Sequence, residues 1–160
     1  MISPTLIRKA EPSDINPMIR LLEQLFSIEE DFTFNEPVQR NGLAMMLNDN
    51  EHRCIMVASS GEQIVGMCSA QLLVSTAEGG MAALIEDMVV AKTFQRQGIG
   101  KKLLHAIEKW AVQKGAKRMQ LLADRNNVNA LHFYKKQKWS ATKLICLRKK
   151  QERRNGCMTN

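Results

Sequence analysis

The residues with the most definite chemistry form a short glycine-containing stretch, Gln95-Arg96-Gln97-Gly98-Ile99-Gly100, which is followed by Lys101 and Lys102. An apolar run precedes the stretch and apolar residues at helical spacing follow it, which predicts a strand, a turn and a helix. Backbone N–H groups at the start of a helix, together with the positive end of its dipole, form a site for a phosphate group. The stretch therefore predicts a binding site for a phosphorylated ligand.

Two widespread glycine motifs do not fit this stretch. A Walker A loop needs Ser or Thr after Gly-Lys, whereas Lys102 follows Lys101 here. A dinucleotide-binding fingerprint needs a third glycine three residues after the second, and that position is Leu103. The pattern Gln/Arg-x-x-Gly-x-Gly/Ala remains, beside the plainer alternative of a glycine-rich connection between a strand and a helix.

Three further side chains near this stretch or downstream of it could transfer protons. Tyr134 is the only tyrosine of the chain, and a phenol can protonate a leaving group. Its plainer alternative is a buried aromatic beside Phe133. Glu86 and Asp87 precede the glycine stretch, and either carboxylate could act as a general base or be an ordinary charge at a strand end.

The elements that must position these side chains follow from the spacing of apolar residues, glycines and helix caps. We expect strands over residues 5–10, 53–59, 63–74, 82–90, 118–123 and 142–147. We expect helices from an N-cap at Ser13 to Phe26, over residues 38–47, from the glycine stretch to Gln113, and over residues 129–136. The order β-α-α-β-β-β-α-β-α-β predicts one α/β domain with a mixed central β-sheet flanked by helices. This domain would cover residues 1–150, and residues 151–160 would form a polar tail.

Composition narrows the class of protein. A chain of 160 residues can bury a core of its own, and no segment approaches the roughly 18 consecutive apolar residues of a membrane span. The first residues lack the features of a signal peptide, so we expect a cytoplasmic protein that does not enter membranes. The cysteines form no CxxC pair and have no histidine at ligand spacing, which predicts buried reduced thiols and no metal site. They are Cys54, Cys68, Cys146 and Cys157.

The net charge of +7 raises the question of nucleic acid, because much of the basic excess lies in the C-terminal quarter. However, only 5% of residues are aromatic, and no RNA-stacking motif interleaves the charges. We therefore expect a solvated basic face, or one that attracts an anionic cofactor or an acidic partner, rather than a nucleic-acid site.

Two motifs of this chain, the glycine stretch and a second one about thirty residues after it, together resemble motifs of the GCN5-related N-acetyltransferase (GNAT) family. The glycine stretch is similar to the family's acetyl-coenzyme A loop, and residues 127–134 look like its pattern Asn-x-x-Ala-x-x-Phe-Tyr. Residues 7–10 with Asp14, followed by an amphipathic helix, also resemble the N-terminal part of family members. The resemblance therefore spans about residues 5 to 148. It implies the family's fold and the transfer of an acetyl group from acetyl-CoA to an amine by direct attack in a ternary complex.

The resemblance also implies roles for individual residues. The backbone of Met88, Val89 and Val90 would pair with the pantetheine arm, and the side-chain amide of Asn127 would bind the same arm. Tyr134 would lie near the thioester sulfur and act as general acid. The pyrophosphate would be held by Gln95, Arg96, Gln97, Gly98, Ile99, Gly100, Lys101 and Lys102.

The base is less well defined by the resemblance. Many members carry a glutamate at the position of Glu86 that deprotonates the amine, often through water, while Asp87 is expected to point to the opposite face of the strand. Members that modify protein N-termini carry a glutamate where this chain has Leu122, which argues against that subgroup. His105 and His132 are expected to be surface or packing residues. Lys138 replaces the family's usual glycine, and we expect the turn there to be reshaped.

In the family, the acceptor amine is bound by loops that share no motif. We therefore expect a primary amine of a small molecule as the acceptor, without a more specific identity. Amino sugars, polyamines, aminophosphonates and antibiotics stay open, as does a protein-lysine acetyltransferase. A non-catalytic module that binds or senses acyl-CoA is another alternative, against which Tyr134 speaks. Members of the family often dimerise, so a homodimer is also open. The segment expected to border the acceptor carries Glu29, Glu30, Asp31 and Glu36.

Overall fold

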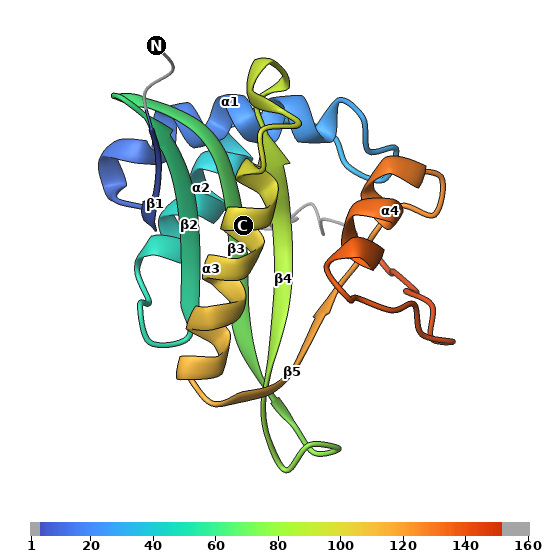
Figure 1. Ribbon diagram of the computed structural model, residues 1–160. Helices are drawn as coiled ribbons and strands as arrows, with labels where there is room; N and C mark the ends of the chain where they lie inside the picture. The colour runs from blue at the N-terminus through green and yellow to red at the C-terminus, as the bar shows by residue number, and fades with distance from the viewer. Residues whose placement is uncertain (1–3, 152–160) are drawn as a thin grey trace, which may run out of the picture.

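The computed structural model describes residues 4–151, whose strands form one sheet with helices packed around it (Figure 1). The strands are β1 (Thr5–Lys9), β2 (Arg53–Ser60), β3 (Gln63–Ser75), β4 (Gly80–Val90) and β5 (Ala116–Leu121). The α-helices are α1 (Ile15–Phe26), α2 (Glu36–Leu47), α3 (Ile99–Gln113) and α4 (Val128–Lys136). Short 3-10 turns, η1 (Pro12–Asp14) and η2 (Lys92–Phe94), precede α1 and the glycine stretch.

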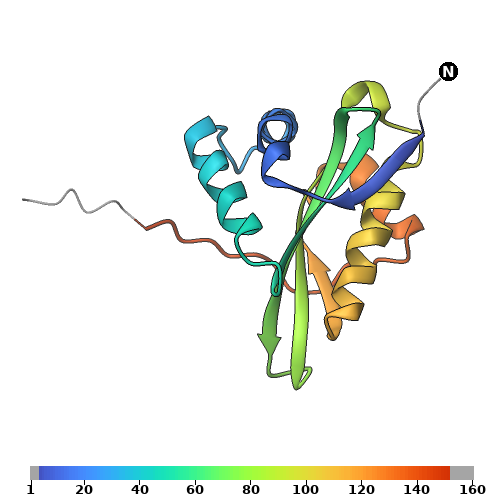
Figure 2. The same cartoon turned by 90° about the vertical axis from the view of Figure 1, so that its left-hand side faces the viewer.

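The sheet has the order β1-β2-β3-β4-β5 and is mixed. Neighbouring strands are antiparallel from β1 to β4, whereas β4 and β5 are parallel. Parallel neighbours need a crossover connection, and α3 supplies it. Helices α1 and α2 cover one face of the sheet and α3 covers the other (Figure 2). This confirms the α/β class and the mixed sheet flanked by helices.

The hydrophobic core is divided between the two faces of the sheet. Leu103 and Ile107 of α3 are buried against one face, and Met18 and Leu22 of α1 are buried against the other. These residues recur at helical spacing, so each helix presents one apolar side to the sheet. The two core layers fix both helices that frame the functional site.

Strand β5 pairs with β4 over only part of the length of β4. The pairing runs from Met81 to Ile85, and β4 then continues to Val90 while β5 diverges from it (Figure 1). Within residues 4–151, no strand pairs with this side of β4 after Ile85. The result is a wedge between the two strands, with α4 beyond β5.

The start of α1 differs from the sequence prediction. Ser13 is not the N-cap, because it lies inside η1 and Asp14 occupies the cap position of α1. The Asp14 carboxylate accepts two hydrogen bonds from the Arg8 guanidinium, at 2.7 and 2.9 Å, and one from the Glu11 N–H at 2.8 Å. A partly buried ion pair thus ties β1 to η1 directly before this helix.

The strand predicted over residues 142–147 is wrong. Residues 139–151 form no helix or strand, and the side chains of Leu144 and Leu147 are each 86% exposed. A strand exists only where its backbone groups meet a partner strand. This segment instead runs from α4 past the sheet toward the side of α1 and α2 (Figure 2). We call residues 140–151 the C-terminal segment.

The cysteine prediction is confirmed for two residues and wrong for a third. Cys54 and Cys68 are buried and free, and burial raises the pKa of Cys54 to about 11 and raises the pKa of Cys68 as well. Cys146 is exposed because its segment is not paired, and Cys157 lies outside the described residues. Among residues 4–151, no helix combines the length and apolarity needed to cross a bilayer, and no group of three metal ligands gathers.

Candidate functional site

A cleft occupies the wedge between β4 and β5 and contains about 430 Å³ of empty space, part of it open to solvent. It brings together Met88 of β4, Asn127 and Tyr134 from the α4 region, and Glu29 from the turn after α1. Three of the residues predicted from the sequence thus meet at one place. The complete lining is Leu25, Ile28, Glu29, Met88, Leu122, Ala123, Asp124, Asn127, Ala130 and Tyr134.

The glycine stretch forms the turn between β4 and α3, as predicted. Gly98 caps α3 with φ of 78°, a left-handed conformation that L side chains rarely adopt. The Lys102 N–H donates to the Gly98 carbonyl at 3.1 Å, so the N–H groups of residues 99–101 precede the first intrahelical bond and point out of the helix start. Arg96, Lys101 and Lys102 are exposed beside them. The arrangement can bind a phosphate group.

Gly100 has a different environment from Gly98. A Cβ at this position would lie 3.6 Å from the Phe133 ring, which is ordinary van der Waals contact. Packing inside the protein therefore does not require glycine here. A ligand that approaches the backbone closely is the remaining physical reason for a missing side chain.

A glutamine that the sequence reasoning missed joins the end of β4 to α1. The Val90 carbonyl accepts hydrogen bonds from the side-chain amides of Gln24 and Gln95, each at 3.0 Å. Gln24 also accepts from the Lys92 N–H at 3.2 Å. Both lone pairs of the Val90 carbonyl are thus occupied. The Val89 carbonyl faces Gly66 of β3, so the open part of the strand edge lies at Met88, which lines the cleft.

A β-bulge lies at the two carboxylates of β4, Glu86 and Asp87. The register between β3 and β4 shifts between Met67 and Ser69, and Asp87 on β4 has a left-handed φ of 51°. The Asp87 carboxylate accepts a hydrogen bond from the buried Ser69 hydroxyl at 3.0 Å. Glu86 is exposed beside it. No regular strand would hold Asp87 in this way.

The carboxylates in and around the cleft are partly desolvated by neighbouring groups, including that of Glu86, whose side chain is still exposed. Burial raises the pKa of Asp87 although the Ser69 bond opposes the shift. Burial, followed by the charge of Asp87, raises the pKa of Glu86. Burial also raises the pKa of Glu29, and the charges of Asp87 and Asp124 add to this effect. A positive charge in the cleft would relieve this repulsion.

Asn127 is the N-cap of α4, a role that the sequence reasoning missed. Its side-chain oxygen accepts a hydrogen bond from the Ala130 N–H at 3.0 Å. The oxygen is therefore engaged by the helix, while the amide NH₂ faces the cleft residues without a hydrogen bond inside the described part of the chain. An Asn three residues before an Ala at a helix start was a usable signal for this cap.

Tyr134 lies on α4 against two other aromatic rings. Its ring centroid is 5.2 Å from that of Phe133 and 6.2 Å from that of Trp139. Burial raises the pKa of its hydroxyl, which therefore stays protonated at neutral pH. Within residues 4–151 the hydroxyl makes no hydrogen bond, so its proton is available to a group in the cleft.

The C-terminus of α4 holds Tyr134 in place through a Schellman motif. The Trp139 N–H donates to the Tyr134 carbonyl and the Lys138 N–H to the Lys135 carbonyl, each at 3.0 Å. Lys138 adopts φ of 65° at the position that usually carries glycine, so the predicted reshaping of the turn does not occur. The Trp139 indole then donates to Glu108 of α3 at 2.8 Å. The helix that carries Tyr134 is thereby fixed to the helix that follows the glycine stretch.

The two histidines take no part in the cleft. His105 on α3 and His132 on α4 are both exposed, as expected for surface residues.

Residues 19–139 match the Acetyltransferase (GNAT) family. An uncharacterized N-acetyltransferase of Archaeoglobus fulgidus is 24% identical over 132 residues, which cover 82% of this chain and 90% of that protein. Streptothricin acetyltransferase A of Bacillus subtilis is 41% identical over 54 residues, so the match spans 34% of this chain and 31% of that protein.

Among solved structures, an aminoglycoside acetyltransferase from an uncultured soil metagenomic sample, meta-AAC0020 in complex with sisomicin, has a TM-score of 0.75. It is 27% identical, and the superposition covers 92% of this chain and 96% of that chain. The likeness therefore extends over most of the fold.

Proposed function

Because the chain belongs to the GNAT acetyltransferase family and is thus an acyltransferase, we propose that it moves the acetyl group of acetyl-CoA to a primary amine of a small molecule. The single observation that carries this proposal is the wedge between β4 and β5. Around it lie a helix start with outward N–H groups and exposed cations, an unpaired strand edge and a tyrosine whose pKa is raised by burial. A thioester with a long, extended, phosphorylated arm fits these three features.

The cofactor would lie along the wedge with its pyrophosphate at the start of α3. The N–H groups of residues 99–101 and the charges of Arg96, Lys101 and Lys102 would hold the phosphates. The pantetheine arm would pair with the free edge of β4 at Met88, as an added strand does. The free NH₂ of Asn127 would donate to an amide carbonyl of the same arm.

The reaction needs little from the protein beyond positioning and proton transfer. The neutral amine attacks the thioester carbonyl carbon, a C–N bond forms, and the C–S bond breaks as the electron pair leaves with sulfur. Tyr134 would donate its proton to the departing thiolate and later regain one from solvent. The raised pKa of its hydroxyl keeps that proton in place until the thiolate forms.

Glu86 would remove the proton that the amine loses, directly or through a water molecule. Its raised pKa makes it a stronger base than an ordinary carboxylate. Asp87 is the alternative base, but its carboxylate is engaged by the Ser69 hydroxyl. We therefore assign Asp87 the role of raising the basicity of Glu86 through its charge.

We infer that the acceptor is a small amine with more than one positive charge. Glu29 and Asp124 line the cleft, and Asp87 and Glu86 add negative charge beside it. Streptothricin acetyltransferase A and the sisomicin-bound aminoglycoside acetyltransferase, both similar to this chain, are named for polyamino compounds. An ammonium group that does not react would pair with Glu29 or Asp124 and orient the group that does.

Release of free thiol from acetyl-CoA against a panel of amines tests the function. The panel contains aminoglycosides, linear diamines, amino sugars and a lysine peptide, and we expect turnover with polycationic small amines. Binding of acetyl-CoA without turnover of any amine would instead indicate a sensing module. A preference for the peptide would indicate a protein-lysine acetyltransferase.

Tyr134→Phe is the matched variant for this assay. Loss of the hydroxyl removes the acid, so we expect kcat to fall by about 100-fold or more. Affinity for acetyl-CoA, measured by calorimetry, should stay within about twofold because the ring and its packing are kept. Turnover equal to that of the wild-type protein would remove Tyr134 from the mechanism.

A further inference from the structure

The turn between α1 and α2 is weakly attached to the rest of the protein. It comprises residues 27–35 and contributes Ile28 and Glu29 to the cleft. Its first residues are bonded to α1, with the Ser27 N–H donating to Glu23 and the Ile28 N–H to Leu25. Asn35 is bonded at the other end, where its N–H donates to Gln39. Between these ends, the loop is not hydrogen-bonded to α1 or α2 within the described part of the chain. We call residues 29–34 the acceptor loop.

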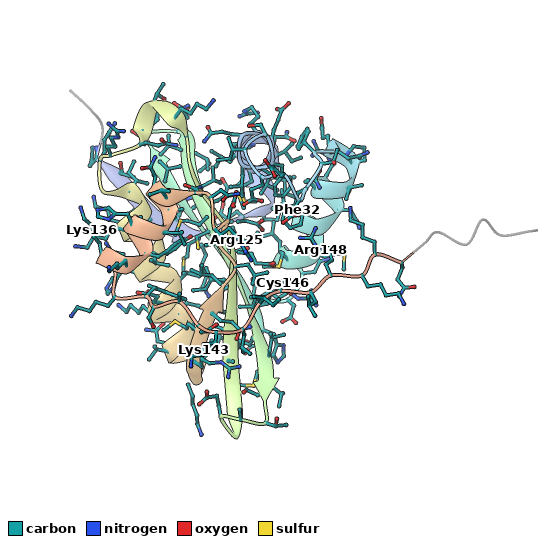
Figure 3. All side chains as sticks on the ribbon, turned by 90° about the vertical axis from the view of Figure 1, so that its right-hand side faces the viewer. Phe32, Arg125, Lys136, Lys143, Cys146 and Arg148 are labelled. Carbon is teal, nitrogen blue, oxygen red and sulfur yellow. The ribbon has the colours of Figure 1, made fainter. Side chains whose placement is uncertain are left out.

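Support for the acceptor loop comes from the C-terminal segment. The Arg148 guanidinium donates a hydrogen bond to the Asp31 carbonyl at 3.0 Å, across 117 positions of sequence. Within the described part of the chain, this is the one hydrogen bond that the acceptor loop makes. The same guanidinium lies 4.7 Å from the centroid of the Phe32 ring, and Figure 3 shows the two side chains beside each other.

Phe32 connects the Arg148 guanidinium to the hydrophobic core through Phe26. Its ring stacks on that of Phe26 at 5.5 Å, with 30° between the planes. Phe26 is the last residue of α1 and packs against the buried cluster on that face of the sheet. The guanidinium, the loop ring and the helix ring therefore form one continuous set of contacts.

The other end of the C-terminal segment adjoins the opposite side of the cleft. Trp139, directly before the segment, lies beside the Tyr134 ring and donates to Glu108. The segment thus joins the helix that carries Tyr134 to the loop that carries Glu29. Its hydrophobic side chains Leu144 and Leu147 are exposed, so Arg148 rather than apolar packing holds its far end.

We propose that Arg148 is a positioning residue for amine binding, which orders the acceptor loop through the Asp31 carbonyl and the Phe32 ring. This inference rests on the proposed function, because it assigns the acceptor loop to the amine side of the cleft. The Asp31 side chain contributes little to it. Its carboxylate is 3.9 Å from the guanidinium and the two side chains are 38% and 81% exposed, and exposed ion pairs of this kind have small effects.

The first experiment is hydrogen–deuterium exchange, which needs no activity. In Arg148→Ala we expect the amides of residues 27–35 to exchange at least about fivefold faster than in the wild-type protein. Lys143→Ala removes the same charge from the same segment, and Lys143 makes no hydrogen bond or ion pair within residues 4–151. This control should exchange like the wild-type protein. Unchanged exchange in Arg148→Ala would overturn the proposal.

The second experiment is steady-state kinetics with an amine that the wild-type protein acetylates. Arg148→Ala should raise KM for the amine about fivefold, while kcat and the affinity for acetyl-CoA stay within about twofold. Phe32→Leu should act in the same direction, Arg148→Lys should restore part of the loss, and Asp31→Asn should stay within about twofold. Faster exchange with an unchanged KM would also overturn the proposal.

The two experiments separate this inference from the proposed function. If the wild-type protein turns over no amine, the proposed function fails, and the inference about amine binding fails with it whatever the exchange rates are. If the wild-type protein is active and Arg148→Ala matches it in both experiments, only the inference fails.

Discussion

At the scale of single residues, the surroundings of the cleft shift the pKa values of the proposed acid and the proposed base in the directions that acetyl transfer would need. Burial raises the pKa of the Tyr134 hydroxyl and keeps its proton. Burial and the Asp87 charge raise the pKa of Glu86 and make its carboxylate more basic. The same physical cause, poor solvation of charge, thus serves opposite roles in a phenol and a carboxyl group.

The proposed role of Glu86 predicts a particular dependence on pH. A base must be deprotonated, so kcat/KM should rise with pH through the raised pKa of Glu86. Asp87→Asn removes the neighbouring charge and therefore lowers the pKa of Glu86. The rise of kcat/KM on the acidic side of the pH profile, its acidic limb, should then move to lower pH. The measurement is kcat/KM between about pH 4.5 and pH 9 for the wild-type protein and the variant.

Glu86→Gln completes that comparison. Loss of the base should lower kcat by about 100-fold and remove the acidic limb. A variant that keeps both the rate and the limb would show that another group accepts the proton.

At the scale of elements, unusual backbone conformations gather around the cleft. The non-glycine residues with positive φ in the described part of the chain are Asp87, Arg96 and Lys138. They lie in the bulge of β4, in the turn before α3 and in the turn after α4. Such conformations cost free energy and persist where the surrounding structure holds them. Here they lie next to Glu86, next to the start of α3 and next to the end of the helix that carries Tyr134.

The double role of Asn127 can be separated by two substitutions. Asp is a good N-cap but has no NH₂ to donate, so Asn127→Asp should keep stability and weaken acetyl-CoA binding. Asn127→Ala should weaken binding too and, in addition, lower the free energy of unfolding by about 1 kcal/mol through loss of the cap. Urea denaturation and calorimetry measure the two effects, and equal stability of both variants would argue against the cap.

The Schellman motif after α4 predicts a stabilising substitution. An L residue in the left-handed region costs roughly 1 kcal/mol, so Lys138→Gly should raise the free energy of unfolding by about that amount while keeping the bonds to Tyr134 and Lys135. Lys136→Gly, in the helical part of α4, is the control and should destabilise by about 1 kcal/mol. Chemical denaturation checks both signs.

At the scale of the whole molecule, one ion pair connects the first strand to the first helix. Arg8 of β1 bonds to the buried carboxylate of Asp14, whose side chain is 7% exposed. The hydrogen bond from Arg8 lowers the pKa of Asp14, against the opposing effect of burial. This pair lies directly before α1, which carries Gln24 and is followed by the acceptor loop.

Asp14→Asn should therefore destabilise the fold by about 2 kcal/mol at neutral pH, because it leaves the Arg8 charge without its partner. Since the pKa of Asp14 is lowered on folding, its contribution is present above the ordinary value of 3.8 and is lost as pH falls through the lower folded value. The difference between variant and wild-type protein should shrink below that pH. Urea titrations at neutral and acid pH measure it.

The exposed pair of Glu36 and Arg40 provides the control for this prediction. Their charged atoms are 2.7 Å apart on the surface of α2, and exposed pairs of this spacing contribute little. Glu36→Gln should change the free energy of unfolding by less than about 0.5 kcal/mol. A loss as large as that of Asp14→Asn would show that burial is not what distinguishes the two pairs.

The sequence by itself determined most helices and strands, the glycine turn, and the order in which Glu86, Gly98, Asn127 and Tyr134 follow one another. These features depend on spacing within a few residues and on the conformations that glycine permits, and both are local properties of a chain. The failure at residues 142–147 has the same origin. The continuous apolar run at residues 144–147 favours an extended backbone, but it does not supply a partner strand.

Only the tertiary structure decided where β5 leaves β4, which carboxylates share the cleft, and which residues hold the loops around it. Gln24 and Arg148 act through contacts across large distances in sequence, and neither belongs to a local pattern. The shifts in pKa likewise depend on solvent that the whole fold excludes. Burial and long-range contact are properties of packed elements, so they exist only once the chain has folded.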